Sequence, residues 1–87
     1  MTDFEQIQKA KKKFISKYAE IFKHAKYDFK AFITKRNEQF ALYALIKETD
    51  NRAKEFTENV FSKTFEYDEK IYRVIIGYGT YTKLQDK

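Results

Sequence analysis

The apolar residues at the start of the chain recur with the 3.6-residue period of an amphipathic helix. Thr2 and Glu5 form a capping-box pattern just before them, in which each side chain accepts a hydrogen bond from the other residue's backbone N–H. We therefore predict a helix from about Asp3 to about Lys26, with the methylene stem of Lys11 lying inside the apolar stripe. The stripe consists of Phe4, Ile7, Phe14, Ile15, Tyr18, Ile21, Phe22 and Ala25.

Residues 28–46 carry apolar positions whose spacing fits a second helix, with Asp28 as its N-cap. Neither Gly nor Pro marks a boundary near Tyr27, and the polar stretch 34–38 offers a second place for a break. Residues 40–46 are almost continuously apolar, which predicts the most buried helical segment of the chain. The apolar positions of this helix are Phe29, Phe32, Ile33, Phe40, Tyr43, Ala44 and Ile46.

Residues 48–51 are the clearest boundary inside the chain, because their polar side chains can cap a helix that begins next to Arg52. Apolar residues then return at helical spacing, and they predict a third helix over about residues 51–63. These residues are Ala53, Phe56, Val60 and Phe61.

From Thr64 the apolar period changes to the alternation of β-strands. We predict a hairpin that pairs residues 64–67 with residues 70–76, joined by a turn at Asp68-Glu69 that lacks the usual Asn-Gly or Asp-Gly sequence. Gly77-Tyr78-Gly79 predicts a bend, and residues 80–82 a short third strand. The chain as a whole is therefore expected to be one α+β domain over residues 1–87. In it, two or three N-terminal helices pack on a small C-terminal antiparallel hairpin or three-stranded sheet.

The amino-acid composition excludes several classes of protein and of functional site. Apolar residues make up 43% of the chain and charged residues 36%, which excludes a disordered chain of low hydrophobicity. The absence of Cys excludes a disulfide framework, a thiolate metal site and a cysteine nucleophile. No stretch approaches the roughly 18 uninterrupted apolar residues of a membrane span, and residues 1–13 do not have the form of a signal peptide. We expect a cytoplasmic protein that binds no cofactor and no membrane.

The net charge of +5 is concentrated in residues 1–36, which hold ten basic and four acidic side chains. In helical projection several lysines fall opposite the apolar stripe, so this face is a candidate surface for an anionic partner. The alternative is a merely solvated face, because Lys outnumbers Arg fifteen to three and phosphate readers favour Arg. The candidate residues are Lys9, Lys12, Lys13 and Lys23.

Tyrosines gather in the C-terminal segment around Arg73. Three interpretations are open: cross-strand pairs that cover a small sheet, a protein interface, or a surface that stacks unpaired bases. Glu66, Asp68 and Glu69 disfavour the last, because they would repel phosphate. Alternation places Val74 on the core face and Arg73 on the outer face. The candidate partner-binding residues are Arg73, Tyr81, Tyr67, Asp68 and Glu69.

Signs of catalysis are weak. His24 has no companion at metal-ligand spacing and is expected to interact with the C-terminal dipole of the first helix. Asp68-Glu69-Lys70 contains the acid-x-Lys element of Mg²⁺-dependent nucleases, in which carboxylates hold the metal, and Asp50 is the best upstream acid. The element falls at a turn, so we expect a non-enzyme with no catalytic residues and no metal.

The sequence thus favours a small non-enzymatic binding protein. Its size and composition are typical of phage or mobile-element inhibitors that occupy a host macromolecular machine, which would place it in the host cytoplasm. A protein partner is the first expectation, nucleic-acid binding through the basic helix is the alternative, and a metal-dependent nuclease comes third. The large apolar surface also predicts a homodimer through the stripe of the first helix.

Overall fold

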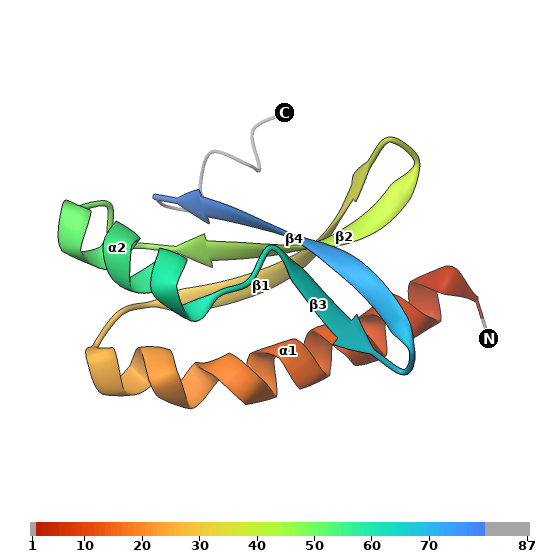
Figure 1. Cartoon of the computed structure of the whole chain (residues 1–87), viewed down its shortest axis with the longest axis horizontal. Helices are drawn as coiled ribbons and strands as arrows, with labels where there is room; N and C mark the ends of the chain where they lie inside the picture. Colours follow the sequence, from red (N-terminus) through yellow and green to blue (C-terminus); the bar gives the residue numbers. More distant parts are fainter. Residues whose placement is uncertain (1, 80–87) are drawn as a thin grey trace.

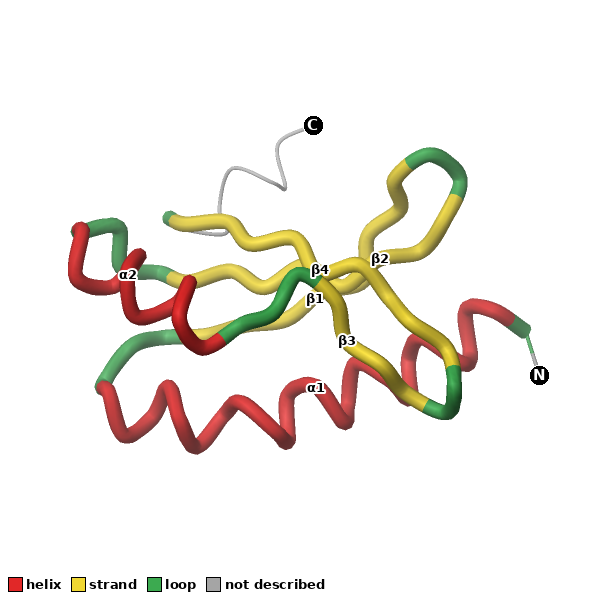
Figure 2. The backbone as a smooth tube through the Cα atoms, viewed as in Figure 1, coloured by secondary structure: helices red, strands yellow, loops and turns green. Residues whose placement is uncertain are grey.

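Six elements follow one another along residues 2–79, which are the residues that the computed structural model describes. Two helices lie on one side of a four-stranded sheet (Figures 1 and 2). In chain order the elements are α1 (Asp3–Ala25), β1 (Phe29–Arg36), β2 (Gln39–Ile46), α2 (Asn51–Val60), β3 (Thr64–Tyr67) and β4 (Lys70–Tyr78).

Helix α1 confirms the first predicted helix. Its capping box is complete, since the Glu5 backbone N–H donates to Thr2 Oγ1 at 3.1 Å and the Thr2 N–H donates to Glu5 Oε1 at 3.2 Å. The helix ends at Ala25, and Lys26 takes the left-handed conformation with φ 66°. The Tyr27 N–H then donates to the Phe22 carbonyl at 3.0 Å, so the last turn is closed without a glycine.

The second predicted helix is wrong: its residues form the antiparallel hairpin β1–β2, in which Phe29 pairs with Ile46 and Arg36 with Gln39. The two central residues of the turn have positive φ, 52° at Asn37 and 68° at Glu38, as a type I′ turn requires. The helix prediction failed because the turn lacks glycine and because β-branched and aromatic residues at positions 29, 32, 33 and 40 fit both periods.

The sheet has the order β1-β2-β4-β3 and is mixed rather than antiparallel. Strands β2 and β4 run parallel, because α2 and β3 return the chain to the end of the sheet at which β2 begins, and β4 starts there. Strand β4 changes partner along its length: residues 70–73 pair with β3 and residues 74–78 pair with β2. The sequence led us to expect at most three strands after two or three N-terminal helices, whereas only one helix precedes the first hairpin.

The third predicted helix and the C-terminal hairpin are confirmed with shifted ends. Helix α2 starts at the Asp50 N-cap, whose carboxylate accepts from the Ala53 N–H at 2.8 Å, and ends at Val60 rather than residue 63. Strand β4 runs through Gly77 instead of bending there. The Tyr43 ring lies over Gly77, where an added Cβ would be 2.7 Å from two ring carbons. The strand expected at residues 80–82 lies outside the described residues.

The hydrophobic core lies between the sheet and the helices. Phe14 is 1% exposed, and its ring centroid lies 5.0–6.0 Å from those of four other rings, contributed by Tyr18, Phe29, Phe61 and Phe65. The central stripe residues of α1 are buried in this core, and of the large stripe residues only Phe4 and Ile21 stay exposed. The stripe is therefore not free to form the dimer contact predicted for it. Within residues 2–79 no helix is long and apolar enough to cross a membrane.

Candidate interaction surfaces

One face of the sheet points away from both helices, and we call it the open face (Figure 1). Within residues 2–79 no helix or strand covers it. Its centre is apolar, and the Phe32 and Tyr43 rings are paired across β1 and β2 with centroids 6.5 Å apart. Basic side chains stand around this centre. By strand alternation the apolar residues are Phe32, Ala41, Tyr43, Leu45 and Ile75, and the basic ones are Lys30, Arg36 and Arg73.

The two hairpins separate at one end of the sheet, and we call this end the hairpin fork. Pairing between β2 and β4 starts at Leu42 and Val74, so residues 39–41 and 70–73 diverge from each other (Figure 2). Ile71 stands at the fork with 66% of its surface exposed, the highest value among the large apolar residues of the described chain. An isolated exposed apolar residue needs no explanation, but this one separates two hollows.

The larger hollow, the fork cleft, has a volume of about 390 Å³ and lies toward the start of α1. Its charged rim includes Lys70, which pairs with Asp3 at 3.5 Å. Tyr72 contributes to its lining and is 4% exposed, and the Tyr72 hydroxyl is buried without a hydrogen-bond partner among residues 2–79. Burial raises the pKa of Tyr72, and nearby Lys70 opposes part of that rise.

The smaller hollow, the arginine hollow, has a volume of about 90 Å³ and shares Gln39, Phe40 and Ile71 with the fork cleft. Arg36 and Arg73 both line it, although the chain contains only three arginines. Its remaining lining residues, Asn37 and Ala41, are uncharged, so residues 2–79 contribute no carboxylate to the hollow. Arg36 Nη1 donates to Thr34 Oγ1 at 3.1 Å, which holds this guanidinium over the open face.

The residues predicted to bind a protein partner are only partly brought together. Arg73 is exposed on the open face as predicted, and Val74 faces the core. Tyr67 lies on the opposite face, half-buried against the core, so it does not act beside Arg73. Asp68 and Glu69 form the exposed β3–β4 turn, where Gln6 Nε2 approaches Asp68 Oδ2 at 3.5 Å. Tyr81 lies outside the described residues.

Arg36 and Ile71 were not among the predicted partner residues. Arg36 lies in the polar stretch of the helix that we predicted over residues 28–46. Its position on the open face follows only from the β1–β2 hairpin. The signal that could have found it is the period-2 series Lys30, Phe32, Thr34 and Arg36, which keeps Arg36 on the face opposite Ala31.

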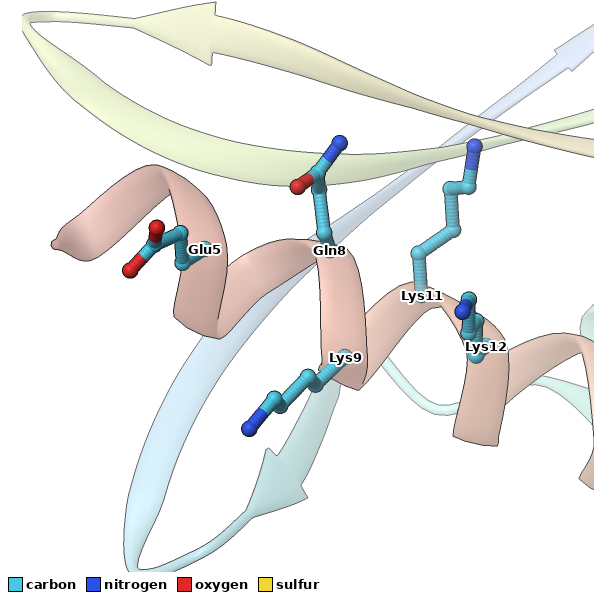
Figure 3. A pocket seen from close by; sticks show the side chains of 5 residues that line it. All are labelled: Glu5, Gln8, Lys9, Lys11 and Lys12. Carbon is cyan, nitrogen blue, oxygen red and sulfur yellow. The ribbon is translucent and has the colours of Figure 1, made fainter. Parts of the chain in front are cut away.

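The predicted basic surface of α1 is present as an exposed lysine face, formed by Lys9, Lys12, Lys13 and Lys23. No acidic residue occurs between Glu5 and Glu20, and within the described chain no lysine of α1 takes part in an ion pair. Lys9 and Lys12 line a shallow hollow of about 520 Å³ with Glu5, Gln8 and Lys11. In Figure 3, Gln8 and Lys11 extend to one side of the helix and Lys9 to the other.

The residues considered for catalysis lie apart. Asp68, Glu69 and Lys70 are at the β3–β4 turn, whereas Asp50 caps α2 at the other end of the molecule (Figure 1). His24 is exposed in the last turn of α1, with Nε2 3.8 Å from Glu20 Oε1. In residues 2–79 no group of three His, Asp or Glu side chains could hold a metal ion.

Comparison with known proteins gives no assignment. No family model matches the chain, and neither the curated proteins nor the solved structures include a detectable match.

Proposed function

We propose that this chain is a small binding protein that attaches non-covalently to a protein partner through the hairpin fork. The observation that carries the proposal is Ile71, exposed at 66% between two hollows. Interface hot spots combine an apolar or aromatic anchor with arginine and with desolvated pockets on the partner's side. The fork offers two of these parts close together: Ile71 as the apolar anchor and Arg73 as the arginine.

The charge at this end favours a protein over nucleic acid. The two hairpin turns carry Glu38, Asp68 and Glu69, and Glu66 pairs with Ile71 across β3 and β4. A strand of phosphates laid across the fork would meet these carboxylates, whereas a protein surface can present basic groups to them and steer the encounter. A compact protein of this kind acts by occupying the surface it binds, in keeping with the inhibitor role expected from size and composition.

The proposal is tested by capture from a lysate, with and without nuclease, using a matched pair of variants. Ile71→Asp places a charge at the fork, while Ile21→Asp places one on α1, where Ile21 is 40% exposed. We expect the wild-type chain and the Ile21→Asp variant to retain one nuclease-resistant protein. The Ile71→Asp variant should lose it by more than tenfold, with circular dichroism unchanged. Equal capture by both variants would reject the fork as the binding surface.

A second candidate function, binding of a polyanion, is favoured by one observation: the α1 lysines have no carboxylate partner in the part of the chain that the structure describes. Neutralising the lysine face with four Lys→Gln changes should lower affinity for an oligonucleotide and flatten its salt dependence. Melting should stay nearly unchanged, because exposed charges contribute little to stability. A variant with Lys30, Lys47, Lys54 and Lys63 changed to Gln removes the same charge elsewhere and should keep the salt slope. If the salt dependence of affinity is the same in the two variants, the lysine face does not bind the polyanion and serves only to interact with solvent.

A further inference from the structure

The arginine hollow is distinguished by its charge. Two arginines line it, and its other lining residues within positions 2–79 include the amides Asn37 and Gln39 but no carboxylate. The side chain of Arg73 forms no hydrogen bond, ion pair or ring contact with any residue in the range 2–79. A guanidinium has five N–H donors in a planar fork that matches an oxyanion. The hollow is therefore a cationic site whose donors are largely unused.

The site is partly preorganised. Arg36 Nη1 donates to Thr34 Oγ1 at 3.1 Å and to the Lys35 carbonyl at 3.4 Å, and its other N–H groups have no partner among the described residues. The floor below is backbone and small side chain, since Ala41 is 2% exposed. Binding of a ligand here costs little conformational entropy at Arg36, because two hydrogen bonds already hold that side chain.

We infer that the arginine hollow binds a carboxylate of the protein partner, with the neighbouring apolar atoms of that partner resting on Ile71. This inference rests on the proposed function and names the chemistry of the partner. The hollow, with a volume of about 90 Å³, has room for one carboxylate and its adjoining carbon. Glu66 faces the same side of the sheet beside Ile71, which disfavours the repeated charges of a phosphate backbone.

The chain offers an internal control for this inference. Its third arginine, Arg52, is exposed on α2 beside Tyr27, Glu55 and Phe56, away from the fork (Figure 1). The three arginine Nε–Hε groups can be observed separately by NMR in the intact protein. A ligand that recognises the hollow must therefore shift two of these signals and spare the third.

The test titrates the protein with N-acetyl-leucine, which combines a carboxylate with an apolar side chain, at constant ionic strength. N-acetyl-leucinamide is the neutral control. We expect the acid to shift the Arg36 and Arg73 signals with one common dissociation constant, and the amide and the Arg52 signal to change little. Arg36→Lys and Arg73→Lys should each weaken binding about tenfold, because a bidentate charged contact is lost, whereas Arg52→Lys should not.

Equal shifts at all three arginines, or equal effects of acid and amide, would overturn the assignment. Inorganic phosphate and the oligonucleotide dT8 form a further arm: tighter binding of either at Arg36 and Arg73 would replace the carboxylate with a phosphate ligand. Failure here is distinguishable from failure of the proposed function. If capture depends on Ile71 but N-acetyl-leucine does not bind, the carboxylate site is rejected and the fork interface stands. If N-acetyl-leucine binds but capture does not depend on Ile71, the carboxylate site stands and the fork interface is rejected.

Discussion

The buried hydroxyl of Tyr72 should cost the isolated protein stability. Tyr72 is 4% exposed and its Oη has no hydrogen-bond partner within the described residues 2–79, so folding removes the hydroxyl from water without a replacement from these residues. Such a group destabilises by about 1–3 kcal/mol. Tyr72→Phe keeps the ring that packs in the core, and we expect it to raise the free energy of unfolding by about 1 kcal/mol. That gain corresponds to roughly 4–8 °C in melting temperature for a domain of this size.

Urea unfolding followed by circular dichroism measures this change, and Tyr78→Phe is the matched control. Tyr78 Oη is also buried without a hydrogen bond of good geometry, but Thr57 lies close enough to lower the Tyr78 pKa against the rise that burial causes. We expect a smaller gain from Tyr78→Phe. Because both hydroxyls are buried, neither change should alter partner binding. A loss of stability in Tyr72→Phe would refute the reasoning, since it would mean that the hydroxyl has a stabilising partner.

The same burial predicts a dependence on alkaline pH. The pKa of Tyr72 is raised above its ordinary value of about 10 because burial disfavours the phenolate. Above pH 10 the unfolded chain releases this proton while the folded chain keeps it, so stability falls as the pH rises toward the folded pKa and is unaffected below pH 10. Tyr72→Phe should reduce this alkaline slope. A slope that stays the same in Tyr72→Phe would contradict the prediction.

Two further predictions concern the core and the sheet. In urea unfolding, Phe14→Ala should destabilise the protein by about 3–5 kcal/mol, because Phe14 is 1% exposed and contacts four rings. Phe4→Ala on the same helix should cost under about 1 kcal/mol, because Phe4 is 46% exposed. Equal costs would mean that the core is not centred on Phe14. Gly77→Ala should cost about 1–3 kcal/mol by displacing the Tyr43 ring, and a double-mutant cycle with Tyr43→Ala should recover part of that cost. Strictly additive effects would show that the ring does not press on Gly77.

The parts of the fold that the sequence predicted carry local signals. The capping box at Thr2 and Glu5 fixes the start of α1, and Asp50 fixes the start of α2 through its bond to the Ala53 N–H. The strands β3 and β4 are rich in β-branched and aromatic residues, so their pairing and the inward direction of Val74 could be predicted. Each of these features is set within a few residues of chain.

The parts that failed depend on contacts distant in sequence. Residues 28–46 contain apolar positions compatible with either period, and the choice is made by Phe14 and Phe22 of α1, whose rings pack against Phe29. Parallel pairing of Leu42 with Val74 has no local sign at all. The arginine hollow follows from these two features, since it requires both the β1–β2 hairpin and the fork. Its residues therefore could not be identified before the topology was known.

The two hairpin turns give a last prediction, because the second central residue of each is a glutamate in a conformation that glutamate disfavours. Glu38 and Glu69 have φ of 68° and 67°, a region that costs a non-glycine residue about 1–2 kcal/mol. Glycine relieves that strain and costs about 0.5–1 kcal/mol of chain entropy in return. Glu38→Gly and Glu69→Gly should therefore each stabilise the protein by about 0.5–1 kcal/mol. The gains should add, because the turns belong to different hairpins.

Lys26→Gly is the matched control, since Lys26 has φ 66° at the end of α1 remote from the fork. All three variants should melt at higher temperature. If the turn glutamates contact basic groups of the partner, Glu38→Gly and Glu69→Gly should bind more weakly at low salt and Lys26→Gly should bind as the wild type does. Unchanged binding in all three variants would confine the partner contact to Ile71 and the arginines. A lower melting temperature in the turn variants would mean that the glutamates stabilise the fold by contacts that outweigh their backbone strain.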